Sequence, residues 1–253
     1  MFRFDNRVAI VTGSGSKRGI GRATAMALSE QGASLVIADM SEEGVKETVK
    51  AIKEKGGKAV GVAVDVRNEE SVANMVKTAI DTYGKIDILV NNAGISQKLS
   101  VADMQLSDMK RIFDVNIFGL FLCTKAVLPY LKANHYGRIV SLSSAAGKRG
   151  GGFLGGPHYS ASKAAVLGFS KNLAREVAAD GITVNCVAPG LIFTDMNSTA
   201  LSDEEVKNIV ATIPIGRRGR VEEVAAAITF LASEEASFIT GEDIDINGGS
   251  HMD

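Results

Sequence analysis

Residues 7–12 read Arg-Val-Ala-Ile-Val-Thr, and residues 13–21 read Gly-Ser-Gly-Ser-Lys-Arg-Gly-Ile-Gly. A short, continuous apolar run of this kind is typical of a strand buried on both faces of a parallel sheet. Apolar residues from Ala23 to Leu28 then predict a helix that ends at Gly32. A strand, a glycine-rich turn and a helix in this order can hold a pyrophosphate on backbone N–H groups and a helix dipole. The alternative is an ordinary Gly-Ser loop, and the position between a strand and a helix favours the phosphate site.

The same alternation continues along the chain. Further strands are expected at 34–38, 59–64, 88–90, 138–142, 183–187 and 244–246. Helices are expected at 42–55, at 69–83, from Ser107 as N-cap to about His135, and from Tyr159 onward. The pattern predicts an α/β fold of the Rossmann type, a doubly wound parallel sheet of about seven strands with helices on both faces. We expect one domain, 1–253.

Composition limits the classes of partner. The chain has 253 residues, 45% of them hydrophobic and 23% charged, which is enough for one large core. The net charge of −1 gives no electrostatic reason to expect a nucleic acid or an anionic membrane surface. There is no signal-peptide core and no apolar run of membrane-spanning length, so a cytoplasmic protein with a small-molecule substrate is expected. Cys123 and Cys186 are interpreted as buried thiols, and the three scattered histidines predict no metal site.

Polar residues follow the carboxyl ends of several predicted strands, the edge where ligands bind in such folds. Asp39 follows the second strand and could accept hydrogen bonds from both hydroxyls of an adenosine ribose, or it could cap the next turn. Asp65 and Val66 follow the third strand, where they could meet an adenine, or Asp65 could cap the next helix. Asn91, Ser144 and Pro189 follow three later strands.

Tyr159 and Lys163 lie four residues apart on a predicted helix and therefore share one face. A neighbouring cation favours the phenolate and would lower the pKa of the tyrosine from its usual value near ~10. Tyr159 is then a candidate acid and base. Two alternatives stand beside this hypothesis: the tyrosine could simply pack its ring, or Ser160-x-x-Lys163 could be the Ser-x-x-Lys of penicillin-binding proteins. The Lys-Thr-Gly and Ser-Asp-Asn motifs of that second class are missing from the sequence.

Asn116 is a polar amide in the middle of the long predicted helix. Such a side chain more often binds a loop than a substrate, although it can also loosen the helix and expose a carbonyl.

With these residues in place, the sequence resembles the short-chain dehydrogenase/reductase family over essentially its whole length. Five motifs agree in order: Thr12-Gly13 through Gly19-Ile20-Gly21, Asn91-Asn92-Ala93-Gly94, Asn116, Ser144 with Tyr159-x-x-x-Lys163, and Pro189-Gly190 with Thr194. Residues 168–171, 181–185 and 247–249 are most similar to 3-oxoacyl-carrier-protein reductases and to the related sugar and polyol dehydrogenases.

The resemblance implies hydride transfer between a nicotinamide cofactor and a secondary alcohol or ketone. It implies Tyr159 as proton donor or acceptor, Ser144 as donor to the substrate oxygen, Lys163 on the ribose and the tyrosine, and Asn116 in a water relay. A donor pair at that oxygen stabilises the developing alkoxide more than the ground state. The implied cofactor-binding residues are Gly13, Ser16, Arg18, Gly19, Ile20, Gly21, Asp39, Asp65, Val66, Asn92, Ala93, Gly94, Tyr159, Lys163, Pro189, Gly190, Ile192 and Thr194.

Two intervals depart from the family pattern. Five residues separate Gly13 from Gly19, where the family usually has three, and the interval from Ser144 to Tyr159 is expanded by glycines.

The basic pair Lys17 and Arg18 resembles residues that meet the 2′-phosphate of NADP, whereas Asp39 resembles the acidic residue of NAD-dependent relatives. Repulsion between a carboxylate and a phosphate outweighs an exposed cation, so NAD is predicted, with Arg18 at the pyrophosphate.

Three further expectations concern the rest of the molecule. Residues 194–214, with a Ser202-x-x-Glu205 capping box, are expected to form a mobile lid over an apolar substrate pocket. The family resemblance implies a tetramer built on the long helices.

The candidates for the substrate mouth are Lys148, Arg149, His158 and Met196, but the sequence does not identify the substrate. NADP-dependent 3-oxoacyl-carrier-protein reductase, a non-catalytic dinucleotide sensor and a serine acyl-enzyme are the alternative functions.

Overall fold

A parallel sheet of seven strands forms the centre of the computed structural model, which describes residues 2–151, 155–195 and 202–252. The strands lie in the order β3-β2-β1-β4-β5-β6-β7. Their bounds are Val8–Thr12 for β1, Ser34–Asp39 for β2, Lys58–Ala63 for β3, Ile88–Asn91 for β4, Gly137–Leu142 for β5, Ile182–Pro189 for β6 and Asp243–Ile246 for β7. The strand order reverses between β1 and β4, which is where ligands bind in open α/β sheets. The predicted fold is confirmed.

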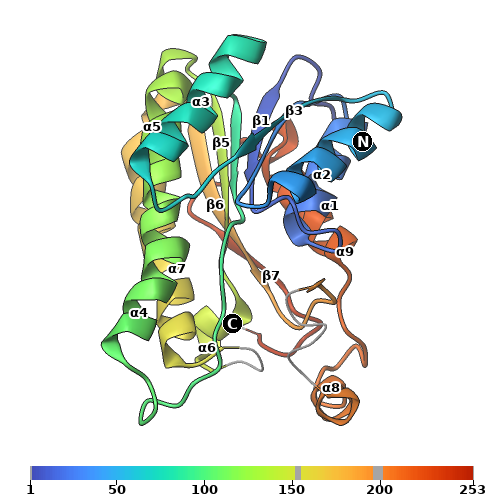
Figure 1. Cartoon of the computed structure of the whole chain (residues 1–253), viewed down its shortest axis with the longest axis vertical. Helices are drawn as coiled ribbons and strands as arrows, with labels where there is room; N and C mark the ends of the chain where they lie inside the picture. Colours follow the sequence, from blue (N-terminus) through green and yellow to red (C-terminus); the bar gives the residue numbers. More distant parts are fainter. Residues whose placement is uncertain (1, 152–154, 196–201, 253) are drawn as a thin grey trace.

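Helices cover both faces of this sheet (Figure 1). One face carries α1 (Ile20–Glu30), α2 (Glu42–Glu54) and α9 (Val221–Leu231), whose apolar residues join one core cluster with β1 and β2. The other face carries α3 (Glu69–Tyr83), α5 (Leu120–Ala133) and α7 (Pro157–Val177), which join a second cluster. Burial on both sides explains why the central strands β1 and β4 are nearly continuous apolar runs, whereas the edge strand β7 alternates Asp and Ile.

The long helix predicted before residue 135 is three consecutive segments: α4 (Leu106–Phe113), a π-helical turn at Asp114–Gly119, and α5. The predicted N-cap, Ser107, is wrong. Gln105 is the N-cap, and its backbone N–H donates to the Asp108 carboxylate at 2.9 Å. Ser107 therefore lies inside the first turn of the helix. The cap rule favours short side chains, and here a longer amide performs the same task.

The stretch Leu106–Ala133 is long and apolar enough, by length and composition alone, to cross a membrane, with a mean hydropathy of 1.5 in its most apolar window. This differs from the expectation that the chain has no such segment. A core helix of a soluble protein passes the same test, and the inner residues of α5 pack against the sheet. The helix is therefore weak evidence for a membrane span.

Two helices are not predicted from the sequence, a third begins earlier than predicted, and a fourth agrees with the prediction at its start. The helix α6 (Ala145–Arg149) lies in the glycine-rich interval, and α9 follows residue 220; neither is predicted from the sequence. The helix α7 begins two residues earlier than expected, at Pro157, since proline suits the first helical position. The Ser202 capping box is confirmed at the start of α8 (Asp203–Val210), with Glu205 as its partner.

Both cysteines are buried and free, as predicted. Burial raises the pKa of Cys123 to about 12 and that of Cys186 to about 11, so neither is a ready thiolate. Within the described ranges, no group of three or more His, Cys, Asp or Glu side chains could hold a metal ion.

Candidate active site

The glycine-rich turn after β1 leaves room for a phosphate. Gly13 has a φ of +64°, and a Cβ there would lie 2.8 Å from the Cα of Ala93. A Cβ at Gly21 would overlap the carbonyl oxygen of Gly13, so this glycine permits the close approach of α1 to β1. Gly19, the N-cap of α1, offers no side-chain hydrogen bond to the first turn. The exposed donors and the dipole of an eleven-residue helix therefore fit a pyrophosphate.

Two residues of this longer turn, Ser14 and Gly15, are fastened to the neighbouring elements. The Ser14 hydroxyl donates to the carbonyl of Val11 at 2.8 Å, and the Thr48 hydroxyl of α2 donates to the carbonyl of Ser14 at 2.9 Å. The backbone N–H of Gly15 donates to the Asp39 carboxylate at 2.8 Å. The longer loop is therefore held against β2 and α2.

Asp39 has the turn-capping role, and the structure leaves room for the ribose-binding role that the sequence also allowed. One carboxylate oxygen accepts the N–H of Gly15, and the other accepts the N–H of Ser41 at 3.0 Å, which is the turn-capping role. Asp39 also lines the cleft that contains Gly13 and Gly19. A carboxylate has about four lone-pair sites, so these two bonds leave acceptor capacity for ribose hydroxyls.

Arg18 contacts a residue that the sequence did not suggest. Its Nε donates to one oxygen of Asp195 at 2.7 Å, and its backbone N–H donates to the other oxygen at 2.8 Å. These bonds hold the pKa of Asp195 below its usual range. The ring of Phe193 lies 5.1 Å from the Arg18 guanidinium and 4.4 Å from that of Arg218. Arg18 thus ties the glycine-rich turn to the chain after β6, and it is exposed as expected.

Tyr159, Ser144 and Lys163 come together at the carboxyl ends of the central strands. The Ser144 side chain is the N-cap of α6 and accepts the N–H of Ala146 at 3.1 Å, and it lines the same cleft as Tyr159. Lys163 donates from Nζ to the carbonyl of Leu142 at 2.7 Å, and its Nζ lies 5.9 Å from the centroid of the Tyr159 ring. The three side chains line the same cleft as the glycine-rich turn.

The expected lowering of the Tyr159 pKa by Lys163 is wrong for this structure. Burial raises the pKa of Tyr159, and the nearby Ser144 side chain offsets this only in part. Burial also lowers the pKa of Lys163, to about 8, because the ammonium is removed from water. The ammonium is aimed at the Leu142 carbonyl rather than at the phenol. Tyr159 is therefore protonated at neutral pH.

Asn116 lies in the π-helical turn and is 2% exposed. Its side-chain oxygen accepts the N–H of Ile95 at 2.9 Å, and its Nδ2 donates to the Ile95 carbonyl and to Ser162, both at 3.0 Å. The Ser162 hydroxyl in turn donates to the backbone carbonyl of Tyr159 at 2.7 Å. The loop-binding role is therefore confirmed, and the helix is loosened there. Sequence reasoning missed Ser162, although its place three residues after Tyr159 is a usable signal.

Most of the implied cofactor residues line one cleft, and they include Ile20, Asn92, Gly94, Pro189, Gly190 and Thr194 together with Ser16. Gly21, Ala93 and Ile192 are not among its lining residues.

Asp65 and Val66 do not line the cleft either. Asp65 accepts a hydrogen bond from the guanidinium of Arg67 at 2.7 Å, and a Cβ at Gly119 would touch Val66. The alternative role of Asp65 as a helix cap is wrong, since Asn68 caps α3 by accepting the N–H of Ser71 at 2.8 Å.

A second cavity, of about 80 Å³, adjoins Ser144 and Tyr159. Of the four candidates for the substrate mouth, Arg149 lines it. Lys148 lies on another side of α6 and pairs with Asp243 at 2.7 Å and Asp245 at 2.9 Å. His158 directs its Nε2 to Gln97 at 3.2 Å, and Met196 lies outside the described residues.

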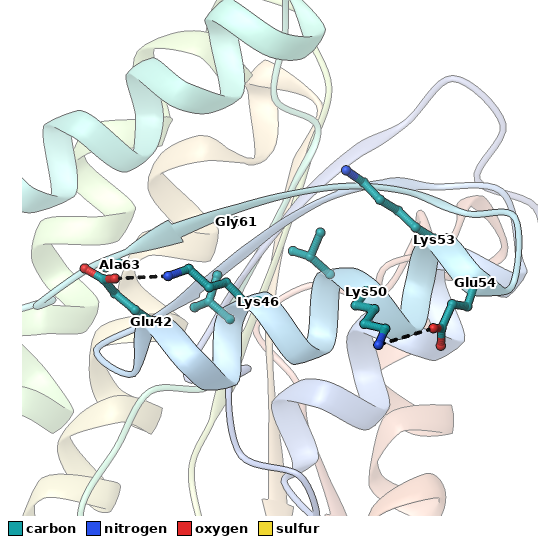
Figure 2. Close-up of a pocket in the computed structure, with 9 residues that line it drawn as sticks. Glu42, Lys46, Lys50, Lys53, Glu54, Gly61 and Ala63 are labelled. Carbon is teal, nitrogen blue, oxygen red and sulfur yellow. Dashed lines mark hydrogen bonds and ion pairs between the residues drawn. The ribbon is translucent and has the colours of Figure 1, made fainter.

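A larger hollow of about 750 Å³ lies away from this site, between α2 and the edge strand β3. Figure 2 shows its charged rim, where Lys46 pairs with Glu42 at 3.4 Å and Lys50 with Glu54 at 3.8 Å along the helix. Such pairs four residues apart are typical of a solvated helix face. Its charged side chains are exposed and paired with one another along the helix, so the hollow is not a candidate active site.

Comparisons with known proteins agree with this geometry. A family model described as enoyl-(acyl carrier protein) reductase matches residues 13–251. A 3-oxoacyl-acyl-carrier-protein reductase of Vibrio cholerae is 42% identical over 248 residues, 98% of each chain, and an uncharacterized short-chain type dehydrogenase/reductase of Sinorhizobium fredii is 40% identical over 96% of each. The crystal structure of levodione reductase superposes with a TM-score of 0.93 over 98% of each chain, at 31% identity.

The sheet, the glycine-rich turn and the Ser-Tyr-Lys cluster define a nicotinamide-dependent oxidoreductase on a Rossmann-type fold. The chain belongs to the short-chain dehydrogenase/reductase family.

Proposed function

We propose that this enzyme transfers a hydride between NAD(H) and a secondary alcohol or ketone. The observation that carries the proposal is the pair of hydroxyl side chains of Ser144 and Tyr159, which line both the cofactor cleft and the adjoining cavity. Loss of NADH turnover in Tyr159→Phe, with NADH binding retained, is the test. A cytoplasmic location and a small-molecule substrate are part of the same proposal.

The chain's own residues supply the proton and the oxygen-binding groups. When bound, the nicotinamide supplies or accepts the hydride. Tyr159, protonated because burial raises its pKa, donates to the substrate oxygen, and Ser144 donates a second hydrogen bond to it. Lys163 would hold the ribose and support Tyr159, and Asn116 would hold a relay water beside the opened turn. These intact groups disfavour a non-catalytic dinucleotide sensor.

The serine acyl-enzyme alternative has no support in the geometry. The Ser160 hydroxyl is buried without a partner in the described part of the chain, and Lys163 donates to Leu142 instead. A nucleophilic serine needs a base within hydrogen-bond reach.

A second candidate function is an NADP-dependent 3-oxoacyl-carrier-protein reductase. The observation in its favour is the 42% identity with reductases of that name from Vibrio cholerae and Synechocystis. Activity with 3-oxoacyl thioesters and a preference for NADPH would distinguish it from the first proposal.

A substrate lid at 194–214 remains a proposal, and residues 196–201 lie outside the described residues. Ile209 and Ile213 of this segment are buried in a small cluster with Leu191, separate from the two main cores. Such a small apolar contact is expected to open readily. We expect amide hydrogen exchange in 203–213 to be much faster than in β4 and β5 without ligand, and slower when NADH and a ketone are bound. Equal protection in the free protein would contradict a lid.

A homotetramer is proposed from the outer faces of α4, α5 and α7, which lie on one side of the molecule (Figure 1). Leu106, Phe118 and Phe121 are exposed by 70%, 54% and 43% on this surface. Phe121 also meets Phe169 of α7 edge to face, which extends the apolar surface across both helices. Apolar patches of this kind mark protein interfaces. Light scattering at micromolar concentration should give four times the chain mass of 26.6 kDa, and a monomer would exclude the proposal.

A further inference from the structure

Arg149 occupies a distinctive place in the cavity beside Ser144 and Tyr159. Ala145, Ala146 and Arg149 are three and four positions apart, so they share one face of α6, and all three line this cavity. The remaining described lining residues are apolar, small or neutral, and include Gly155, Leu191 and Ile213. Among the described residues that line the cavity, Arg149 is thus the single charged side chain.

The other cation of α6 is directed elsewhere. The side chain of Lys148 is 8% exposed and lies between the carboxylates of Asp243 and Asp245 on β7. It fixes α6 to the sheet and brings no charge to the cavity. Adjacent residues of one short helix therefore divide two tasks: Lys148 anchors the helix, and Arg149 faces the place where a substrate would lie.

Arg149 lies at the rim, five residues along α6 from Ser144, which is about 7.5 Å of helix rise. Its Nη1 donates to the backbone carbonyl of Ser250 at 2.8 Å, so the guanidinium is positioned against the C-terminal segment. A guanidinium has five N–H donors in a rigid fork and can hold a carbonyl and a carboxylate together. The next residues, Gly150 and Gly151, have φ of +67° and +73°, which turns the chain away directly after the arginine.

We propose that the substrate is a keto acid or the corresponding hydroxy acid, whose carboxylate binds Arg149 while its carbonyl or hydroxyl lies at Ser144 and Tyr159. This inference rests on the proposed function and names the substrate class for the same site. The small cavity next to the reacting oxygen, about 80 Å³, suits a short substituent there, with a few bonds between the carbonyl and the carboxylate.

The test compares 4-oxopentanoate and 5-oxohexanoate with their methyl esters, which keep the ketone and remove the charge. We expect kcat/KM with NADH to be at least about ten-fold higher for the acids in the wild type. Arg149→Gln should lower kcat/KM for the acids by about ten- to a hundred-fold and change that for the esters by less than about two-fold. Arg149→Lys should keep part of the preference, since it keeps the charge and loses the fork.

Lys77→Gln is the matched control, because it removes one exposed cation on α3, far from the cavity, and should change neither series. Equal use of acids and esters by the wild type would overturn the assignment of Arg149. An equal loss for acids and esters in Arg149→Gln would also overturn it, because it would show that the arginine only anchors the Ser250 segment. If neither series supports NADH oxidation while uncharged ketones outside the two series do, the keto-acid assignment is overturned and the proposed function stands.

Discussion

Tyr159→Phe should reduce ketone-dependent NADH oxidation by about a hundred- to ten-thousand-fold, the usual contribution of a positioned general acid. The substitution removes one oxygen and keeps the ring, which packs so closely that a Cβ at Gly155 would overlap it. NADH affinity should therefore stay within a few-fold of the wild type. Stopped-flow single turnover and fluorescence titration of NADH measure the two quantities separately.

Lys163→Ala is the contrasting variant. Lys163 is proposed to act on both the ribose and the tyrosine, so this change should weaken NADH binding as well as turnover. Substantial activity in Tyr159→Phe would sink the assignment of the general acid.

The pH dependence follows from the same two side chains. The pKa of Lys163 is lowered to about 8 by burial, so its charge is present below that pH and is lost as the pH rises through it. The pKa of Tyr159 is raised, so the phenol stays protonated over that range. The value of kcat/KM for NADH in ketone reduction reports the free enzyme and should fall above about pH 8. A profile that stays flat to pH 9.5 would contradict these assignments.

Asp39→Ser should remove most of the preference for NADH over NADPH, which we expect to be about ten-fold to several hundred-fold in kcat/KM for the wild type. The carboxylate lies at the end of β2, fixed by the N–H groups of Gly15 and Ser41. Because it is held on both oxygens, it cannot easily turn away from a 2′-phosphate. At ~4 Å and an effective dielectric near 20, repulsion amounts to several kcal/mol before screening. The ribose hydrogen bonds that NADPH cannot offer are worth a further ~1.5 to 3 kcal/mol.

The basic residues of the turn oppose this only weakly. Arg18 already binds Asp195 through its side chain and its backbone, and exposed ion pairs contribute about 1 kcal/mol or less. Asp81→Ser removes the same charge from the exposed face of α3 and is the control for net charge. A wild type that prefers NADPH, or a ratio that does not respond to Asp39→Ser, would show that another residue selects the coenzyme.

The sequence by itself determined the sheet and the edge at which the site lies. The strand Val8–Thr12 is apolar up to its last residue, and only a sheet covered on both faces buries such a run completely. The glycines at 13 and 21 mark close backbone approaches that any larger residue would prevent. These features depend on local sequence, so they can be predicted before the tertiary structure is known.

Contacts between distant segments were decided only by the tertiary structure. The sequence shows Lys163 one turn from Tyr159, but it does not show that Lys163 is buried or that its Nζ is directed to the carbonyl of Leu142. The pKa of the tyrosine is therefore raised where local spacing predicts that it falls. Arg18 and Asp195 meet across 177 positions. Lys148 and Arg149, adjacent in the chain, face opposite environments because the sheet lies on one side of α6 and the cavity on the other. Solvation and long-range pairing depend on the packed fold, and no local pattern encodes them.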